Sequence, residues 1–226
     1  MTDIHDAGNA VDRQALLQTM ADMQAAHNEQ VHGQWQAQGY AYYRAVWVEC
    51  AELLDHYGWK WWKHQVPDLD QARLELVDIW HFGLSELLRA DAMQQVLPAF
   101  EALPEESIAG EPERFRLAVE ALAEASLATR AFPLDAFVAA LAALPMTFTE
   151  LFELYVGKNV LNRFRQDNGY ADGSYRKLWQ GREDNEHLME IVAALPASTP
   201  AYPDALYAAL AQRYAADTAA ASADTA

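Results

Sequence analysis

Apolar positions recur at helical spacing along most of the chain. Between residues 12 and 31 they fall three or four positions apart, and Gly33 follows as a stop signal. A second segment, from about Tyr40 to Tyr57, is apolar on nearly every side and ends before Gly58. These patterns predict two helices, and the second is expected to be central because it has no clear polar face.

A third helix is predicted to begin after Pro67. Asp68 and Gln71 have the spacing of a capping box, and a strongly apolar segment follows them. The sequence then changes to Ala-rich, acidic helices over residues 98–145, with a loop near residues 104–112 and a break at Pro133. We interpret this stretch as an inserted helical subdomain.

The C-terminal part of the chain contains three more predicted helices. Thr147 and Glu150 have capping-box spacing and begin the first of them. Glycines frame a loop at residues 169–173, a second helix is expected from about Ser174, and a last amphipathic helix follows Pro203.

The predicted fold is therefore all-α, a helical bundle core with an inserted Ala-rich helical subdomain. Only ten Gly and nine Pro occur in 226 residues, which favours helices over many short strands. We expect a single domain over residues 1–215, with residues 98–145 as its variable helical part. Residues 1–10 are expected to be frayed, and residues 216–226 to form a disordered tail.

The charge balance limits the class of partner. The chain has 16 Lys and Arg against 33 Asp and Glu, so it should attract divalent cations and is not expected to bind a nucleic acid duplex. Cys50 is the only cysteine, which excludes an internal disulfide. We predict no membrane span and no signal peptide, and hence a cytoplasmic protein.

Two pairs of carboxylates are the strongest chemical signal. Glu49 and Glu52 lie three positions apart in the second predicted helix, and Glu75 and Asp78 do the same in the third. Each pair could be the solvated edge of an amphipathic helix. The apolar neighbours of Glu49 and Asp78 and the scarcity of nearby Lys or Arg favour a metal site, because cations would relieve the repulsion.

All-oxygen ligands select hard cations, so we expect Mg²⁺, with Mn²⁺ as a possible substitute. Such ions commonly join carboxylates to substrate phosphates, which makes a nucleoside triphosphate the natural substrate. We expect water activated at this cluster to attack a phosphorus atom, with Glu49 as the favoured base.

Residues 49–63, ECAELLDHYGWKWWK, resemble the dimeric all-α dUTPases of kinetoplastids, some bacteria and phages. That family belongs to the all-α NTP pyrophosphohydrolases, which include MazG-like enzymes, and carries an ExxE pair, a spacer and an ExxD pair. The resemblance implies hydrolysis of dUTP, and of dUDP as well, to dUMP, with release of pyrophosphate from dUTP. It also implies a homodimer in which the uracil pocket is completed across a twofold axis.

Residues 157–170, GKNVLNRFRQDNGY, are similar to the phosphate-binding segment of the same family. Lys158, Asn162 and Arg165 would line one side of a helix, where they suit phosphate oxygens, although a basic solvated surface is the alternative. The resemblance extends the predicted phosphate site to Tyr170 and Lys177. Further candidates for the site are Asn185 and Lys63.

The first predicted helix offers candidates for recognising the base. Gln24 and Asn28 lie one turn apart and interrupt an apolar stripe, and their amides can pair with the donors and acceptors of uracil. The resemblance implies that a tryptophan from residues 59–62 also contacts uracil, and we select Trp61. Core packing is the alternative for these indoles, and His56 and His81 are expected to be packed histidines.

Two other functions remain open from the sequence. One is an all-α pyrophosphohydrolase for a different nucleoside triphosphate, which would change only the base pocket. The other is a helical interaction protein whose carboxylates merely hold a structural metal. The basic segment near an acidic cluster argues against this second alternative, since a scaffold has no need of it.

Overall fold

The computed structural model describes residues 12–101, 103, 110–195 and 201–223. Within these residues the chain forms nine α-helices, two short 3-10 helices and one antiparallel hairpin, which confirms the predicted all-α fold. The α-helices are α1 (Arg13–Val31), α2 (Tyr42–Tyr57), α3 (Leu69–Arg89), α4 (Val96–Glu101), α5 (Pro112–Thr129), α6 (Leu134–Ala143), α7 (Phe148–Asp167), α8 (Asp184–Ala194) and α9 (Tyr202–Ala223). The 3-10 helices are η1 (Trp35–Ala37) and η2 (Met93–Gln95), and the strands are β1 (Leu178–Trp179) and β2 (Arg182–Glu183).

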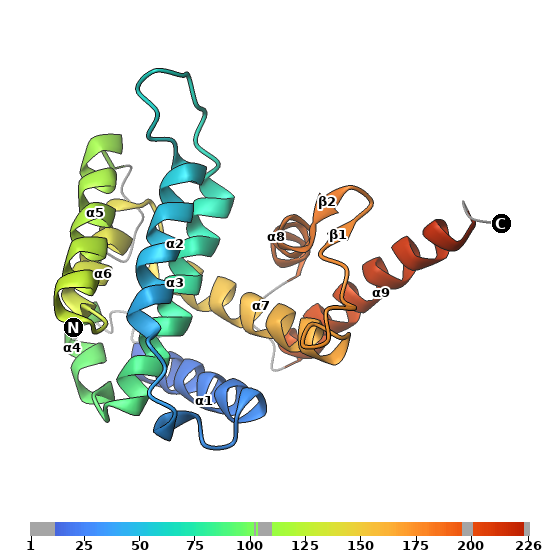
Figure 1. The fold of residues 1–226 in the computed structure, drawn as a ribbon, viewed down its shortest axis with the longest axis horizontal. Helices are drawn as coiled ribbons and strands as arrows, with labels where there is room; N and C mark the ends of the chain where they lie inside the picture. Colours follow the sequence, from blue (N-terminus) through green and yellow to red (C-terminus); the bar gives the residue numbers. More distant parts are fainter. Residues whose placement is uncertain (1–11, 102, 104–109, 196–200, 224–226) are drawn as a thin grey trace, which may run out of the picture.

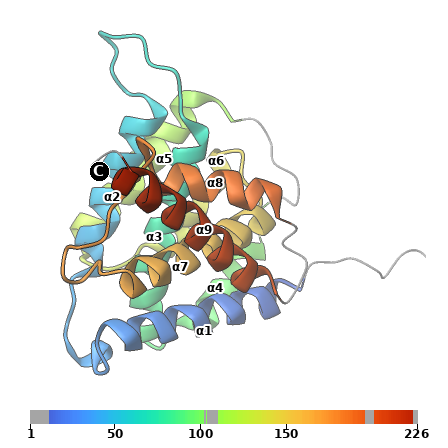
Figure 2. The same ribbon diagram turned by 90° about the vertical axis from the view of Figure 1, so that its right-hand side faces the viewer.

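Helices α2 and α3 form the central hairpin of the molecule (Figure 1). Gly58 ends α2 with a positive φ of 92°, which a residue with a side chain rarely adopts. Asp68 caps α3 by accepting a hydrogen bond from the backbone N–H of Gln71 at 3.1 Å. The connection between the two helices projects beyond the rest of the chain (Figures 1 and 2).

The remaining helices cover the central hairpin on different sides. Helices α5 and α6 pack together, and α5 also contacts α2. Helices α1 and α7 contact each other and α3 from the other side. Helix α9 packs on α7, and α8 contacts α7, α9 and also α3, with the β1–β2 hairpin beside α8 and α9 (Figures 1 and 2). Helix α3 is therefore enclosed, as expected. Helix α2 is central but not enclosed, because it buries one side only and leaves Trp47 and Val48 exposed.

The middle segment shares the core of the central hairpin. The indole of Trp80 on α3 stacks on Phe137 at 5.3 Å and also packs against Phe100 and Phe132. All four side chains belong to one cluster of buried residues. The Ala-rich helices are present as predicted, and they contribute aromatic side chains to the same core instead of forming one of their own. Residues 104–109 of the predicted loop lie outside the described residues.

The helix predicted from about Ser174 is wrong. Residues 178–183 form the β1–β2 hairpin, and α8 begins only at Asp184. Gln180 and Gly181 both have positive φ, which the tight turn requires. The indole of Trp179 is fully buried and stacks on His187. Burial of this side chain stabilises the hairpin where the sequence predicted the start of a helix.

The two chain ends differ from each other. Residues 1–10, predicted to be frayed, lie outside the described residues. Helix α9 continues to Ala223, whereas the sequence predicted a disordered tail from residue 216. Alanine has the highest helix propensity, which accounts for the continuation. No single described helix is long and apolar enough to cross a membrane; only the sharply bent pair α6 and α7 has sufficient length and apolar composition together.

A close contact in α3 gives a first prediction. A methyl group at Gly83 would lie about 2.4 Å from the ring of Phe132, too close for two carbon atoms. We expect Gly83→Ala to lower the free energy of unfolding, because overpacking costs roughly 1–3 kcal/mol and outweighs the gain of about 1 kcal/mol or less in helix propensity. Urea unfolding of the two proteins measures the difference.

The double variant Gly83→Ala/Phe132→Leu is the control, because the smaller side chain removes the contact. The double variant should lose less free energy of unfolding than the sum of the losses measured for the two single variants. Additive effects in this cycle would contradict the steric explanation.

Candidate active site

Three of the predicted carboxylates converge between α2 and α3, where Glu75 is buried, Glu49 half-buried and Glu52 exposed. Carboxylate oxygens of Glu49, Glu52 and Glu75 lie within 4.8 Å of one another. Glu49 and Glu52 come from α2 and Glu75 from α3, where it is buried. The i, i+3 spacing in two packed helices brings them together as predicted. This all-oxygen group fits a hard divalent cation.

The proximity of these acids perturbs their protonation. Burial is the main cause that raises the pKa of Glu49 to about 9, and the charges of Asp78 and Glu75 add to it. Burial also raises the pKa of Glu75, again with a contribution from Asp78. Among the described residues, the only basic side chain within ion-pair distance of these three glutamates is His56, whose Nε2 lies 3.5 Å from Glu75. A divalent cation would replace the protons that the cluster otherwise retains.

The fourth predicted carboxylate, Asp78, has a different partner. Its Oδ2 lies 2.7 Å from Nζ of Lys158, whose side chain is only 2% exposed. The ammonium also donates a hydrogen bond to Asn185 at 3.1 Å. Lys158 from α7 therefore lies at the α3 side of the cluster, and its contacts to Asp78 and Asn185 fix the position of its ammonium group.

Arg165 connects α7 to the beginning of α8. Its Nε and one terminal nitrogen donate hydrogen bonds of 2.8 Å each to the fully buried carboxylate of Asp184. Burial alone would raise the pKa of Asp184, but the hydrogen bonds and charge of Arg165 hold it below its usual value. The other terminal nitrogen donates to Asn162 at 3.2 Å. This fork orients the guanidinium toward the cluster.

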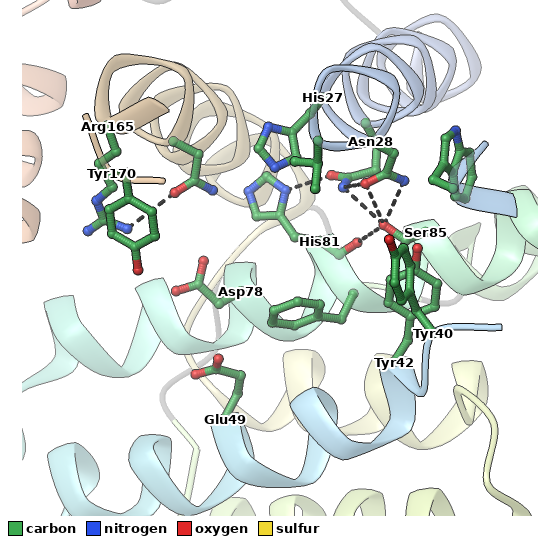
Figure 3. A pocket seen from close by; sticks show the side chains of 15 residues that line it. His27, Asn28, Tyr40, Tyr42, Glu49, Asp78, His81, Ser85, Arg165 and Tyr170 are labelled. Carbon is green, nitrogen blue, oxygen red and sulfur yellow. Dashed lines mark hydrogen bonds between the residues drawn. The ribbon is translucent and has the colours of Figure 1, made fainter. Parts of the chain in front are cut away.

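A cavity of about 360 Å³ runs from Arg165 and Tyr170 past the carboxylates toward α1 (Figure 3). Glu49 and Asp78 point toward each other at its middle, Arg165 and Tyr170 lie at one end, and Asn28 lies at the other (Figure 3). The volume suits a nucleoside. Its remaining lining residues are Gln24, His27, Val31, Trp35, Tyr40, Tyr42, His81, Phe82, Ser85 and Asn162.

The two predicted amides of α1 meet at the inner end of this cavity. The amide nitrogen of Gln24 donates to Asn28 and to Ser85, each at 3.0 Å. Its amide oxygen accepts from the Tyr155 hydroxyl at 2.8 Å and lies 2.7 Å from Nδ1 of His81. The sequence thus located both amides correctly beside the cavity, but not the groups that surround them.

The structure does not bring Trp61 and Lys63 to the cavity within one chain. Both lie on the projecting α2–α3 loop, where Trp61 is 89% exposed and both residues border a separate hollow near α5. Tyr170 borders the cavity, whereas Lys177 borders a second hollow on the other side of the carboxylates, together with Asn185. Lys177 also lies 3.4 Å from Glu183.

Sequence reasoning missed several cavity residues. Ser85 lies in an apolar helix and is not marked by any motif, and His81 was expected to be only a packed histidine. Tyr155, which does not border the cavity but donates to Gln24, was missed as well. Trp35 lies on η1, and Tyr40 and Tyr42 lie around the start of α2, where the chain returns from α1. The sequence did carry a signal for His81. It follows Asp78, a predicted metal ligand, by three residues, and this spacing places both side chains on the same side of the helix.

An all-α fold with a carboxylate cluster, buried cations and a nucleoside-sized cavity defines a nucleotide hydrolase. Residues 16–170, more than half of the chain, match the dUTPase family. The chain belongs to this family and is a dUTP diphosphatase, which confirms the resemblance seen in the sequence. No curated protein matches the chain.

The raised pKa of Glu49 predicts the pH dependence of stability without metal. Its ordinary value is 4.5 and its folded value about 9, so between these pH values the folded protein binds more protons than the unfolded chain. In EDTA the free energy of unfolding should therefore fall as the pH rises from about 5 to 9. Glu49→Gln should weaken this fall, measured by urea unfolding across the pH range.

Glu120→Gln serves as the matched control, since Glu120 is exposed on α5. It should retain the wild-type pH dependence. If Glu49→Gln and wild type lost the same free energy of unfolding over this pH range, the protonation of Glu49 would not be the cause of the loss.

Proposed function

We propose that the protein hydrolyses dUTP to dUMP and pyrophosphate with Mg²⁺ held by the carboxylate cluster, Mn²⁺ being a substitute. The proposal depends chiefly on one observation: the carboxylates, the buried cations and the amide-lined end belong to adjoining parts of one continuous site. Hydrolysis of dUDP follows from the same proposal, because the cluster requires only a phosphate chain beside the base.

We assign metal binding and proton transfer to the carboxylates. Glu49, Glu52 and Glu75 would hold the cation, with Asp78 beside them. Bound Mg²⁺ would neutralise phosphate charge and lower the pKa of water. Glu49 would accept the proton of the attacking water. Glu49 and Asp78 both border the cavity and the second hollow, but Asp78 is already paired with Lys158.

Basic and polar side chains on the α7 side would bind the phosphates. Lys158 and Arg165 provide charges that are fixed before substrate arrives. The further phosphate-binding residues that we propose are Asn162, Tyr170, Lys177 and Asn185, each of which borders one of the two hollows. Gln24 and Asn28 would lie at the uracil end.

We further propose that the enzyme is a cytoplasmic homodimer in which the α2–α3 loop of one subunit completes the site of the other. The side chain of Gln65 accepts hydrogen bonds from the backbone N–H groups of Trp59 and Lys60 at 2.9 and 2.7 Å, which fixes the fold of the loop. Trp61 nevertheless remains 89% exposed, next to the exposed indoles of Trp59 and Trp62, and such an apolar group suits contact with a second subunit. Lys63 would accompany it as a possible phosphate ligand.

The substrate assignment predicts selective, metal-dependent turnover. Pyrophosphate release from dUTP, dTTP, dCTP and UTP should be rapid only for dUTP, and EDTA should abolish it. Glu49→Gln should lower kcat by about 100-fold or more while the protein remains folded, as expected for loss of a general base.

The same assay distinguishes the alternatives. Rapid turnover of another nucleotide would retain the metal chemistry and overturn the uracil assignment. Wild-type turnover by the folded Glu49→Gln variant would overturn its role as the base. If none of the four nucleotides were hydrolysed, the proposal that the protein is a pyrophosphohydrolase for them would be wrong.

The shared site predicts complementation between two inactive variants. Glu49→Gln and Trp61→Ala homodimers should each have low activity on dUTP. A hybrid dimer would combine the intact carboxylates of one subunit with the intact Trp61 of the other in one of its two sites. After denaturation and refolding of an equal mixture, about a quarter of wild-type activity should return.

Mixing the folded homodimers without exchange of subunits is the control and should restore nothing. If the refolded mixture gave no more activity than the two variants measured alone, Trp61 would not act across the dimer.

A further inference from the structure

The amide of Gln24 has no hydrogen-bonding capacity left for a base. Its nitrogen donates to Asn28 and Ser85, and its oxygen faces the Tyr155 hydroxyl and Nδ1 of His81. An amide has two donor hydrogens and two acceptor lone pairs, so all four are used. Gln24 is also only 3% exposed. These contacts make it a support for its neighbours.

Ser85 decides which way the amides point. Its hydroxyl donates to the backbone carbonyl of His81 at 2.9 Å and accepts from Gln24 and Asn28 at 3.0 Å each, which uses its single hydrogen and both lone pairs. With both amides reversed, the hydroxyl would face three carbonyl oxygens with one hydrogen. With Gln24 alone reversed, its oxygen would face the amide oxygen of Asn28. Neither alternative satisfies the buried groups.

His81 and Tyr155 support the same orientation from the other side of Gln24. The imidazole is buried, and burial together with the charge of Lys158 keeps its pKa well below the ordinary value, so the ring is neutral and has one N–H. On Nδ1 this hydrogen meets the amide oxygen of Gln24 at 2.7 Å, whereas Nε2 has no partner among the described residues. The ring therefore carries its hydrogen on Nδ1.

Of these side chains, Asn28 retains one free amide hydrogen and one acceptor lone pair. The Ser85 hydroxyl lies 3.4 Å from its amide oxygen but gives its single hydrogen to the closer carbonyl of His81. An amide can pair with uracil by donating to O4 and accepting from N3–H, and a reversed amide can pair with cytosine in the same place, because the donor and acceptor at these positions are exchanged. A freely rotating Asn28 would accept both bases. An Asn28 amide held in one orientation pairs with only one arrangement of donor and acceptor on the base.

We propose that Ser85, Gln24, His81 and Tyr155 are positioning residues that lock the Asn28 amide in the orientation that selects uracil over cytosine. This inference rests on the proposed uracil site and assigns direct contact with the base to Asn28, not Gln24. Loss of the lock allows Asn28 to turn, so that the penalty on cytosine is reduced while binding of uracil weakens.

The test compares Ser85→Ala with Ser126→Ala. Both serines are buried in helices and donate to the carbonyl four residues earlier, but Ser126 lies on α5, outside the cavity. For Ser85→Ala, the ratio of kcat/KM for dUTP to that for dCTP should fall by about 10-fold, as expected for one buried hydrogen bond. The change should appear in KM more than in kcat. Ser126→Ala should keep the wild-type ratio.

Tyr155→Phe provides a second variant that preserves shape, with Tyr202→Phe as its control, because the buried hydroxyl of Tyr202 has no partner among the described residues. Tyr155→Phe should also lower the dUTP to dCTP ratio. Nitrogen NMR of the wild-type enzyme should place the proton of His81 on Nδ1.

The outcomes separate this inference from the proposed function. Wild type without preference for dUTP over dCTP would overturn the proposed uracil recognition itself. A wild-type preference that both Ser85→Ala and Tyr155→Phe retain would overturn the lock alone, and so would a His81 proton on Nε2.

Discussion

Carboxylates from α2 and α3 face one another inside the fold, and their mutual repulsion must be offset by cations. Burial makes the problem acute, since it raises the pKa of Glu49 to about 9 and that of Glu75 above its usual value. Lys158 compensates Asp78 at 2.7 Å. Arg165 is held nearby by Asp184. The packing of α7 and α8 against the central hairpin follows from this need for charge compensation as well as from apolar contacts.

The same constraint separates the two ends of the cavity. Toward α7 and α8 the lining is charged and suits phosphates, whereas toward α1 it consists of neutral amides, a hydroxyl and aromatic rings. Neutral hydrogen bonds at fixed orientation can discriminate bases, while charges bind any phosphate chain. The family assignment to dUTPases agrees with this division, because a dUTPase must distinguish a base and cleave a triphosphate in one site.

The projecting α2–α3 loop combines internal order with exposure. Besides the hydrogen bonds from Gln65, the carbonyl of Gly58 accepts a 2.8 Å hydrogen bond from Arg116, and the backbone N–H of Asp68 closes the base of the loop on the carbonyl of His56. In the dimer that we propose, covering this loop would cost little entropy because it is already ordered. Within its own chain, Trp61 is 89% exposed.

The sequence by itself determined the helices with clear start and stop signals, the two carboxylate pairs and the paired amides of α1, because helical spacing places such residues on one side wherever the helix packs. It missed the β1–β2 hairpin, which depends on burial of Trp179 against distant helices, and the helical continuation of α9. Only the tertiary structure decided that Asp78 pairs with Lys158, that Trp61 lies away from its own cavity, and that Ser85 and Tyr155 surround Gln24. These contacts join residues far apart in the chain, and local sequence carries no signal for which distant polar group will satisfy a buried one.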